Sequence, residues 1–573
     1  MSSMEKKLKG YPSIDLPRQS AKEKLSILIQ KPIKTPNQNL YKFVVRRPRF
    51  NACNIVCKCY DQELSFYQLQ MEAERHAKAF AGIGVKKGDI VPICTEPSIE
   101  AVIAFFALNR LGAVSTFLNN TASMDEIANY VNLYDSKLLL VSAQCAQRLD
   151  KDELKKHCCM QDMYILSSES AENSSDVSLF SEQLANYADI QVELDVCGKD
   201  APAHISYTSG TTGLPKAILL SNENIMAEVL ALRKATKLML GPKGNTLQVV
   251  PFNYPYGFIT TVLLHIYSGK TPALTPSLTL KNIHEYLEMY KPCYINGIPS
   301  FYKRFIHDPL IQKMDLSFIK YPITGGDTLD SHLANEINNF FRAHGSKGKI
   351  SNGYGNGEAS GAILSPASVL RSPSPGSCGW PIPGLSVKLI DSETGKPVPV
   401  GHSGRFCFSG TNVMMEYYRD AEATEQVFHY DEDGRKWFYT DTYMHMDEKN
   451  CMFMDGRERR FFITFDETGS AYKVYCDYVQ KVIAESIPEI TDCAVVQRED
   501  ETRSLVPVAF VSLKNPEKWN AQFANELRSR CQHKLQNCAV PTEFIPIEEL
   551  PLTHAGKVDY RVLERKAQKE VEG

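Results

Sequence analysis

Hydrophobic residues near the N-terminal end of the chain recur three or four positions apart, which is the spacing of a helix. The apolar positions of this predicted helix are Phe66, Leu69, Ala73, Ala77 and Phe80. Ser65 precedes them and Gln68 follows three residues later, which is the pattern of a capping box. Gly82 is a natural stop, so the sequence predicts a helix between Ser65 and Gly82.

Continuous apolar runs follow at residues 90–94 and 113–118, and a second helical pattern at residues 100–111 separates them. Short apolar runs of this length are typical of fully buried strands. Strands that alternate with helices along a chain form parallel sheets that the helices cover. The first half of the chain is therefore predicted to consist of parallel β/α layers.

Two stretches rich in small and polar residues interrupt this pattern. Residues 167–181 are rich in Ser, Glu and Asn and predict a surface loop. Residues 365–379 are rich in Ser, Pro and Gly, and shorter β-like segments separated by Gly and Pro follow them. These later segments predict a β-rich subdomain.

The C-terminal part changes character again. It holds an amphipathic helical pattern, two apolar strands and a second helical pattern, at residues 474–484, 493–496, 506–511 and 520–535. That is a compact α+β unit of the size of a separate domain. We expect an α/β protein with a large N-terminal domain of parallel β/α layers plus a β-rich subdomain, and a small mobile α+β C-terminal domain. The expected boundaries are 1–455 for the large domain, 456–460 for a hinge and 461–573 for the small domain.

Length and charge narrow the possible partners. At 573 residues the chain is too long for one ordinary domain. Its 64 basic and 67 acidic residues leave a net charge of −3, which gives no electrostatic reason to expect nucleic acid or an anionic membrane as a partner. The apolar run at residues 101–108 is far short of the ~20 residues that cross a bilayer, so we expect no membrane span.

The 16 cysteines are scattered without the spacing of a disulfide framework. Cys57 and Cys59 fall in a predicted strand, where they would share one face as small core residues. No second Cys or His pair lies at the distance of a zinc finger. The N-terminus is not followed by the apolar stretch of a secretion signal, so we expect a reduced cytoplasmic protein.

The most specific local motif is Tyr-Thr-Ser-Gly-Thr-Thr-Gly-Leu-Pro-Lys, from Tyr207 to Lys216. Glycines let backbone N–H groups turn toward a polyanion, hydroxyls add donors, and the lysine adds a positive charge. A predicted strand precedes the motif and an apolar run follows Lys216, which argues against a flexible Ser/Gly linker. The sequence lacks the Gly-x-x-x-x-Gly-Lys-Ser/Thr motif, so this is a different phosphate-binding loop.

The motif resembles the phosphate loop of the adenylate-forming superfamily: acyl- and aryl-CoA ligases, adenylation domains that load carrier proteins, and luciferases. Further segments between residues 64 and 561 resemble other motifs of this superfamily, in the same order. They are residues 297–299, 324–327, 352–358, 379–384, 437–441, 456–457 and 550–557.

This resemblance implies a two-step reaction. ATP and a carboxylate form an acyl-adenylate and pyrophosphate, and a thiol then displaces AMP. The first step brings an anionic carboxylate to an anionic phosphate, so neutralising charge is the main physical problem. The implied small molecules are a carboxylic acid, ATP, Mg²⁺, and coenzyme A or the phosphopantetheine of an acyl carrier protein.

The resemblance also assigns roles to residues. Glu358 and Thr208 would hold Mg²⁺, and catalysis would depend on them together with Lys216 and Lys557. Lys557 would reach between the attacking carboxylate and the α-phosphate, and Arg459 would be the hinge about which the small domain rotates after adenylation. The acid pocket would include Asn253, Tyr254, Gly257 and Gly297. The nucleotide would be bound by Thr208, Ser209, Gly210, Thr211, Thr212, Gly213, Lys216, Gly325, Gly326, Asp327, Asn352, Gly353, Tyr354, Gly355, Asn356, Asp441 and Arg457.

Several positions depart from the family pattern. Gly357 stands where the family has a Thr before the motif glutamate. A gapless count puts Thr442 at the place of the ribose-binding Asp, so either the loop shifts and Asp441 binds the ribose or that contact is lost. Tyr254 stands where many relatives have a His at the aromatic gate, and residues 463–473 replace a short Ser-Gly-Gly loop that lines the thiol site in the family.

Three functions remain open. The leading one is an ATP-dependent acid–thiol ligase that forms an acyl-CoA. A second is an enzyme that loads an acyl carrier protein. That carrier would be a separate protein, because no carrier domain is visible after Lys557. A third is a nucleotide-binding protein without catalysis, which the departures favour and which the retained phosphate loop, Glu358, Arg457 and Lys557 oppose. No Arg or Lys stands out in the predicted acid pocket, so a fatty or aryl acid is expected.

Overall fold

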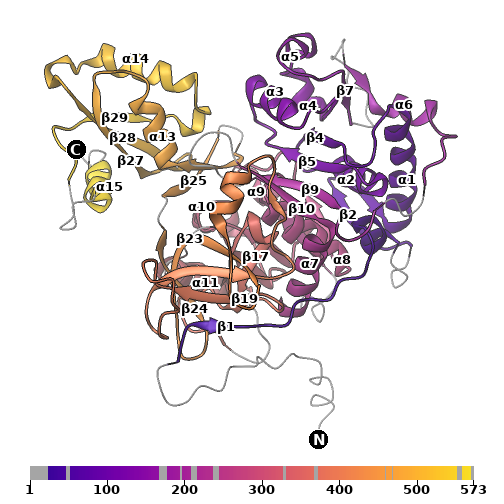
Figure 1. Ribbon diagram of the computed structural model, residues 1–573, viewed down its shortest axis with the longest axis horizontal. Coiled ribbons are helices and arrows are strands. Elements are labelled where there is room, and N and C mark those ends of the chain that lie inside the picture. The colour runs from indigo at the N-terminus through magenta and orange to yellow at the C-terminus, as the bar shows by residue number, and fades with distance from the viewer. Residues whose placement is uncertain are drawn as a thin grey trace, which may run out of the picture.

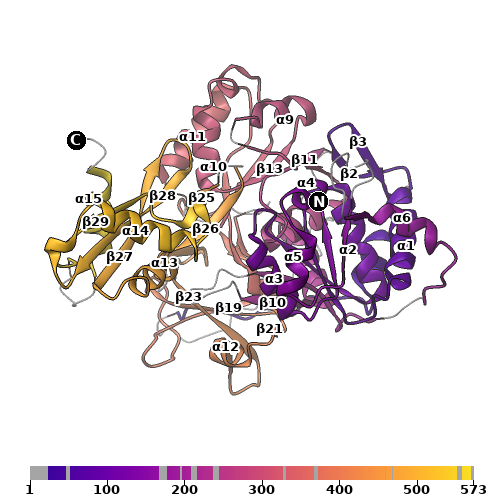
Figure 2. The same cartoon turned by 90° about the horizontal axis from the view of Figure 1, so that it is seen from above.

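A computed structural model of the protein describes residues 24–46, 52–166, 177–193, 197–207, 216–236, 244–279, 281–326, 329, 331–366, 372–457, 460–466, 469–551 and 558–569. The chain forms a large N-terminal domain and a small C-terminal domain, which is the lobe at the upper left of Figure 1. The same two parts are separate in the view from above (Figure 2). The predicted fold class is confirmed.

The first sheet of the large domain has eight strands in the order β21-β10-β9-β5-β4-β6-β7-β8. Its strands are β4 (Ile90–Cys94), β5 (Val114–Leu118), β6 (Leu138–Val141), β7 (Asp162–Ile165), β8 (Ser178–Leu179), β9 (Pro202–Tyr207), β10 (Ala217–Ser221) and β21 (Glu416–Tyr417). The adjacent strands β9, β5, β4, β6, β7 and β8 run parallel, as the alternation of strands and helices predicts. The phosphate-loop motif connects β9 to β10, which pair antiparallel.

Helices cover this sheet. They are α1 (Phe66–Gly82), α2 (Ile99–Leu111), α3 (Met124–Leu133), α4 (Ala143–Gln147), α5 (Lys151–His157), α6 (Phe180–Asn186) and α7 (Asn222–Thr236). The predicted capping box of α1 is present. The Ser65 hydroxyl accepts from the backbone N–H of Gln68 at 3.2 Å, and the side-chain Oε1 of Gln68 accepts from the backbone N–H of Ser65 at 2.8 Å. Helices α1, α2 and α6 lie side by side at the end of the molecule away from the small domain (Figures 1 and 2).

The loop predicted at residues 167–181 is wrong at its C-terminal end. Ser178–Leu179 form β8, and Phe180 begins α6. Phe180 is buried and stacks on Phe80 of α1, with ring centroids 4.5 Å apart. Burial of this aromatic ring, together with Leu184, outweighs the polar composition that precedes it. Residues 167–176 lie outside the described residues.

The second sheet has seven strands in the order β15-β14-β13-β11-β12-β2-β3, and all but the β2–β3 pair are parallel. Its strands are β2 (Ile55–Cys59), β3 (Gln62–Ser65), β11 (Asn245–Gln248), β12 (Thr271–Leu274), β13 (Tyr294–Gly297), β14 (Tyr321–Thr324) and β15 (Ser351–Asn352). The helical segments around it are η3 (Tyr256–Leu263), α8 (Leu264–Tyr267), α9 (Ile283–Tyr290), α10 (Pro299–His307) and α11 (Ser331–Ala343). In β2, Cys57 is buried and Cys59 is half-buried.

A β-rich part follows, as the sequence predicts. Its six-stranded sheet comprises β1 (Ile27–Leu28), β19 (Ser386–Ile390), β20 (Gly404–Ser409), β22 (Phe428–Tyr430), β23 (Lys436–Met446) and β24 (Met452–Arg457). A smaller sheet comprises β16 (Tyr354–Asn356), β17 (Gly361–Ser365) and β18 (Trp380–Pro381), and α12 (Ala421–Val427) leads into β22.

The small domain begins with the hairpin β25–β26 (Phe461–Phe465 and Ala471–Tyr475). Helix α13 (Cys476–Ala484) begins two residues later than the predicted helix, because Val474 and Tyr475 belong to β26. The remaining elements are β27 (Ile490–Asp500), β28 (Ser504–Leu513), α14 (Ala521–Gln532), β29 (Glu543–Pro546) and α15 (Tyr560–Lys569).

The small domain contacts the large one through polar side chains at its margin. Lys303 of α10 forms an ion pair with Glu499 at 2.7 Å, and Arg304 donates to the backbone oxygen of Asp500 at 2.8 Å. On another side, the Gln536 amide donates to the carboxylate of Glu126 in α3 at 3.1 Å. Hairpin β25–β26 also packs on the large domain, because Ile463 and Phe465 belong to the same hydrophobic cluster as Ile298 and Phe301.

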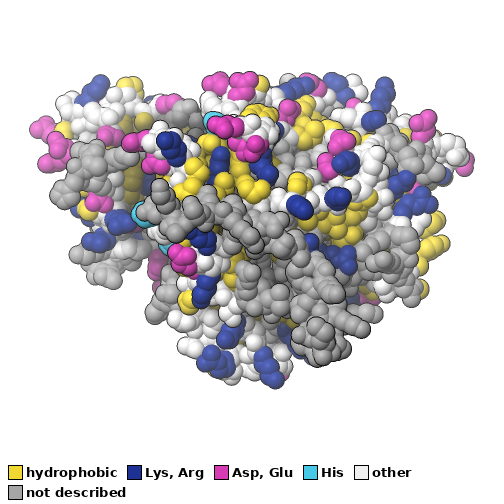
Figure 3. Space-filling view, turned by 60° about the horizontal axis from the view of Figure 1, so that its bottom comes forward, with side chains coloured by type: hydrophobic (Ala, Val, Ile, Leu, Met, Phe, Trp, Pro, Cys, Tyr) yellow, Lys and Arg dark blue, Asp and Glu magenta, His cyan; other side chains and the backbone are white. Residues whose placement is uncertain are grey.

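The surface carries charges of both signs. On the face drawn in Figure 3, Asp and Glu side chains lie mainly along the upper margin, and Lys and Arg side chains are spread over the rest. Within the described part of the chain, every helix is too short or too polar to cross a membrane.

Candidate active site

A cavity of about 380 Å³ lies against the seven-stranded sheet, and both domains contribute to its wall. Tyr321, Ile323 and Gly325 of the β14 segment line it, and alternate residues of a strand share one face. From Tyr321 to Gly325 the cavity therefore follows the sheet for ~13 Å. Segments η3 and α8 form the opposite wall, and hairpin β25–β26 covers one side. A volume of this size suits a small-molecule ligand.

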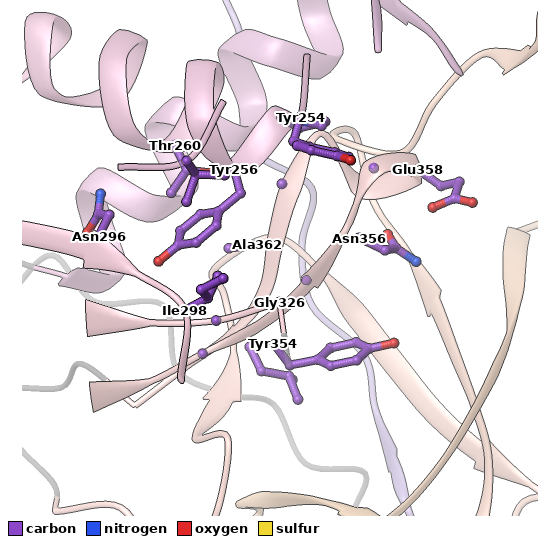
Figure 4. A pocket seen from close by; sticks show the side chains of 18 of the residues that line it. Tyr254, Tyr256, Thr260, Asn296, Ile298, Gly326, Tyr354, Asn356, Glu358 and Ala362 are labelled. Atoms are coloured by element: carbon purple, nitrogen blue, oxygen red, sulfur yellow. The ribbon is translucent and has the colours of Figure 1, made fainter. Parts of the chain in front are cut away.

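Glu358 lies at one end of the cavity, on a short helical turn after β16 (Figure 4). Its Oε1 accepts a hydrogen bond from the Tyr417 hydroxyl at 2.7 Å. The Lys216 ammonium lies over the ring of the same tyrosine, 4.7 Å from its centroid. Lys216, Tyr417 and Glu358 therefore form one connected group where the phosphate-loop motif ends.

The carboxylate of Glu358 fits a magnesium ion. Mg²⁺ is usually held by one or two carboxylates together with phosphate oxygens and water, not by a cage of protein ligands. Within the described ranges, no group of three or more His, Cys, Asp or Glu side chains is arranged to hold a metal ion. Thr208, the second predicted metal ligand, lies outside the described residues.

Gly357, the first departure from the family pattern, has a packing reason. A Cβ built on this glycine would lie 2.3 Å from Cδ1 of the buried Ile218. The preceding Asn356 accepts from the Ala359 N–H at 3.0 Å and so caps the turn that carries Glu358. A threonine at position 357 would need Ile218 to move.

The second departure concerns two neighbouring residues of β23. Asp441 lines the cavity, whereas Thr442 is fully buried and is not part of the lining. The Thr442 hydroxyl lies 2.9 Å from the Tyr354 hydroxyl, behind the cavity wall. Of the two residues, Asp441 is therefore the one with access to the cavity. Arg457 ends β24 and pairs with Thr442 in the sheet, but its side chain is outside the described part.

The other predicted nucleotide residues divide into three groups. Those on the cavity wall are Lys216, Gly325, Gly326, Gly353, Tyr354, Gly355, Asn356 and Asp441. Asn352 is described and is not part of the lining. Residues outside the described ranges are Thr208, Ser209, Gly210, Thr211, Thr212, Gly213 and Asp327, and the same holds for the predicted hinge Arg459 and the predicted catalytic Lys557.

The predicted acid-pocket residues are only partly on the cavity. Tyr254 lines it, whereas Asn253, Gly257 and Gly297 do not. The two glycines serve the packing instead. A Cβ on Gly257 would lie 2.0 Å from the Pro251 oxygen, and a Cβ on Gly297 would lie 2.8 Å from the Phe301 ring. Their lack of a side chain is explained by the backbone and by helix α10.

Three polar residues that the sequence reasoning missed lie at the end opposite Glu358. They are Thr260 of η3, His265 of α8 and Asn296 of β13, and all three line the cavity. Thr260 and Asn296 appear in Figure 4 on the far side of Tyr256 from Glu358. A polar residue inside an otherwise apolar segment, as at position 296 in Tyr-Ile-Asn-Gly, is the signal that could have found them.

Glu228 of α7 lies behind this end of the cavity. It is fully buried, with Oε1 accepting from the Ala362 N–H at 2.7 Å and Oε2 accepting from the Asn412 amide at 2.9 Å. Burial raises the pKa of this carboxyl to about 8, although the two hydrogen bonds oppose that rise. Thr260 is nearby, since a Cβ on Gly361 would lie 2.6 Å from its Oγ1 and 3.0 Å from Glu228 Oε1.

Besides Lys216, the basic residues Lys320, Lys349 and Arg405 line the cavity, although the sequence predicts no prominent Arg or Lys near the acid. Lys320 and Lys349 stand at the starts of β14 and β15, beside the exposed Tyr321. They are at the surface and so mark an outer mouth of the cavity. Nothing in their sequence context distinguishes them from other surface lysines.

The small domain contributes five residues to the cavity wall. They are Phe461, Ile463, Ala471, Tyr472 and Tyr475, all on β25 or β26. Ile463 lies close to Gly326 of the large domain: a Cβ built on that glycine would be 4.0 Å from Ile463 Cδ1. Pro551 and Val558, which flank the segment containing Lys557, do not line the cavity.

This arrangement of motifs and domains is that of one enzyme class. The family pattern for AMP-binding enzymes matches residues 43–418, and that for the AMP-binding enzyme C-terminal domain matches residues 482–557. Since the first match covers more than half of the chain, the protein belongs to the AMP-binding, adenylate-forming enzymes. The resemblance seen in the sequence is confirmed.

Relatives and solved structures agree with this family. The chain is 27% identical over 459 residues to 4-coumarate–CoA ligase 4 of Arabidopsis thaliana, covering 78% of this chain and 77% of the relative. Among solved structures, the amide bond synthetase McbA of Marinactinospora thermotolerans superposes with a TM-score of 0.75 at 20% identity, over 93% of this chain and 100% of the other. A variant of o-succinylbenzoate CoA synthetase of Bacillus subtilis gives 0.72 at 20% identity, over 92% and 99%.

Proposed function

We propose that the protein activates a carboxylic acid with ATP and transfers the acyl group to the thiol of coenzyme A. The observation that carries this proposal is one continuous cavity, which joins the family's nucleotide motifs to a pocket on the sheet. Hairpin β25–β26 of the small domain forms one side of it. In the first step a carboxylate oxygen attacks the α-phosphorus of ATP, and pyrophosphate leaves. In the second step the thiol sulfur attacks the acyl carbon, and AMP leaves.

Charge neutralisation in the first step would come from residues at one end of the cavity. We propose that Lys216 and the phosphate-loop residues Thr208 to Thr212 hold the β- and γ-phosphates. Glu358 and Thr208 would hold Mg²⁺, which withdraws electron density from phosphate oxygens when it is bound. Tyr417 keeps the Glu358 carboxylate in place through the 2.7 Å hydrogen bond.

The nucleoside would occupy the middle of the cavity. Gly325, Gly326 and Gly353 leave a slot for a flat base next to Tyr354, and Asp441 would accept hydrogen bonds from the ribose hydroxyls. We propose that Arg457 adds a contact to the ribose and that Asp327 and Asn352 complete the adenine site. The shift from Thr442 to Asp441 keeps an acceptor for a diol that would otherwise be buried without one.

The second step would use the arrangement of domains seen in this structure. Hairpin β25–β26 faces the cavity, and the residues that flank Lys557 do not line it. We propose that rotation about residues 456–460, with Arg459 as the hinge, brings Lys557 to the acid and the α-phosphate for adenylation. The orientation in Figure 1 would then belong to thiol transfer.

The acid would lie between η3 and β14. Tyr254, Tyr256, Ile298 and Ile323 give this part of the cavity apolar and aromatic walls, which suit an aryl or fatty acyl group. The named activity of the Arabidopsis thaliana relative, on 4-coumarate, is an activity on an aryl acid, and it supports this choice.

The test is acid-dependent exchange of pyrophosphate into ATP, without any thiol, over short, medium and long fatty acids and aryl acids. We expect exchange by the wild type with at least one acid and its loss in Lys557→Ala. Coenzyme A is then added, and acyl-CoA formation is compared with loading of a phosphopantetheinylated carrier protein. Exchange without acyl-CoA but with carrier loading would replace the acceptor, and ATP binding without exchange would indicate a non-catalytic protein.

A further inference from the structure

The end of the cavity opposite Glu358 contains buried polar atoms that have no hydrogen-bond partner among the described residues. They are Thr260 Oγ1, Asn296 Oδ1 and both ring nitrogens of His265. Asn296 and His265 are only 2% and 1% exposed. Buried polar atoms in native proteins almost always have a partner, so three such residues around one cavity require an explanation.

The orientation of the Asn296 amide is fixed by its neighbours. The Thr261 hydroxyl donates its proton to the Tyr256 backbone oxygen at 2.8 Å, so its oxygen is free to accept from the Asn296 Nδ2 at 3.2 Å. With Nδ2 committed, Oδ1 is left as an acceptor on the cavity wall. Asn296 Oδ1 is therefore a hydrogen-bond acceptor without a donor among the described groups of the protein.

His265 adds a second polar group of defined character. Burial lowers the pKa of its imidazole to about 4, so near neutral pH the ring is uncharged, with one N–H donor and one acceptor nitrogen. The backbone oxygens of Thr260 and Thr261 are near the ring, but neither nitrogen makes a hydrogen bond of ordinary geometry. The ring is held edge-to-face against Tyr294, with centroids 5.6 Å apart.

We propose that Asn296, His265 and Thr260 form a recognition site for a hydroxyl group carried by the acid substrate, away from its carboxylate. This inference rests on the proposed function and narrows its substrate class from fatty or aryl acids to hydroxylated ones. A hydroxyl donates to Asn296 Oδ1 and accepts from the His265 N–H or the Thr260 hydroxyl, so it satisfies an acceptor and a donor at once.

The position of this site sets the geometry of the acid. Asn296 pairs with Ile323 in the sheet, three residues before Gly326, so it lies ~10 Å along the strand from the expected nucleotide end. A hydroxyl near the far end of an aryl or medium-length alkyl acid would reach it. Lys320 and Lys349 lie further out, at the surface.

The experiment compares acids that differ only by the hydroxyl, in the pyrophosphate exchange assay. The pairs are para-hydroxyphenylpropanoic against phenylpropanoic acid, and octanoic acid against its terminally hydroxylated form. We expect kcat/KM to be roughly 10- to 100-fold higher for the hydroxylated acid, because an acid without the hydroxyl leaves the buried polar groups unpaired. Octanedioic acid is the third arm, because a second carboxylate would be drawn to Lys320 and Lys349.

Two variants test the residues. Asn296→Leu and His265→Phe should each bring the ratio of the two acids toward unity, mainly by improving the acid without the hydroxyl. Ile323→Val is the matched control, because it changes an apolar group on the same wall and should leave the ratio unchanged. Thermal unfolding of each variant identifies those that fail to fold.

The outcomes separate this inference from the proposed function. Exchange with equal rates for both members of each pair would overturn the hydroxyl site and leave the ligase activity standing. Preference for the dicarboxylic acid would overturn it in favour of the lysines at the mouth. Failure of every acid to support exchange or to bind would overturn both.

Discussion

The two ends of the cavity are built differently. Around Glu358 the polar side chains are already paired with one another: Tyr417 with Glu358, Lys216 over Tyr417, and Tyr354 with Thr442. At the far end, Asn296 Oδ1 and the His265 ring lack such partners in the described structure. Both ends are polar, and the side chains around Glu358 are the ones paired with one another; Thr324 Oγ1 and Asn352 Oδ1, in the segments predicted to bind adenine, also lack a partner in the described structure.

This difference separates what every reaction cycle needs from what one substrate needs. The nucleotide end must hold the same triphosphate each time, so its groups can be positioned in advance by hydrogen bonds within the protein. The acid end leaves its hydrogen bonds to the ligand, which is how a site discriminates between similar molecules. Four predictions would break or sharpen this comparison.

The largest effect is expected at the paired end. Glu358→Gln keeps an oxygen for the Tyr417 hydroxyl but removes the negative charge, so acid-dependent exchange should fall by ~10²–10³-fold. Glu416→Gln, at an exposed position next to Tyr417 in the chain, is the matched control. Wild-type exchange rates in Glu358→Gln would show that this carboxylate is not needed, and the distinction between the two ends would be lost.

Behind the acid end, Glu228 should make stability depend on pH. Its folded pKa of about 8 lies above the ordinary 4.5, so the folded protein keeps a proton that the unfolded chain releases. The stabilising contribution is complete below pH 4.5 and is lost as the pH rises toward 8, by up to about 1.4 kcal/mol per pH unit.

Urea unfolding of the wild type and Glu228→Gln at several pH values measures this directly. Glutamine does not titrate, so the stability of the wild type relative to Glu228→Gln should decrease steadily from pH 5 to 8. A difference that stays constant over this range would show that Glu228 is ionised in the folded protein, which would make the acid end a charged one.

Gly357→Thr tests how tightly the paired end is packed. It restores the family hydroxyl, but Ile218 Cδ1 occupies the space that its Cβ needs, so the free energy of unfolding should fall by about 1–3 kcal/mol. Adding Ile218→Val should recover part of the loss. If Gly357→Thr alone is as stable as the wild type, the packing explanation for this glycine is wrong.

The smallest effect compares one hydrogen bond at each end. Thr442→Val removes the hydroxyl that lies 2.9 Å from the Tyr354 hydroxyl and should lower the free energy of unfolding by about 1 kcal/mol. His265→Phe keeps the ring against Tyr294 and loses no well-formed hydrogen bond, so it should not destabilise the protein without substrate. Equal losses in the two variants, measured by urea unfolding, would mean that His265 is already satisfied, for example by water.

Sequence patterns predicted those features whose residues lie next to one another in the chain. The capping box of α1 needs only Ser65 and Gln68, and the phosphate-loop and Glu358 motifs are contiguous in the chain. The departure at Gly357 could be seen in the sequence, but its cause could not, because Ile218 comes from a different strand. Likewise, only the structure shows that Asp441 lines the cavity and that Thr442 does not.

The acid end lay beyond prediction because it is assembled from distant segments. Thr260, His265 and Asn296 come from a helical segment and a strand, and no motif connects them. Gly257 and Gly297 were assigned to the pocket by resemblance, although the backbone at Pro251 and the ring of Phe301 account for both. Similarly, Phe180 is held in α6 by its stacking on Phe80, which the polar residues before it conceal.

The wall shared by both domains has a thermodynamic consequence. Because Gly326 of the large domain and Ile463 of the small one face the same space, any molecule that fills the cavity touches both bodies at once. Binding and docking of the small domain are then linked functions, and each must change the other by the same factor. Weakening the margin contacts of Lys303 and Gln536 should therefore also weaken binding of the occupant, by at most the factor by which docking is weakened.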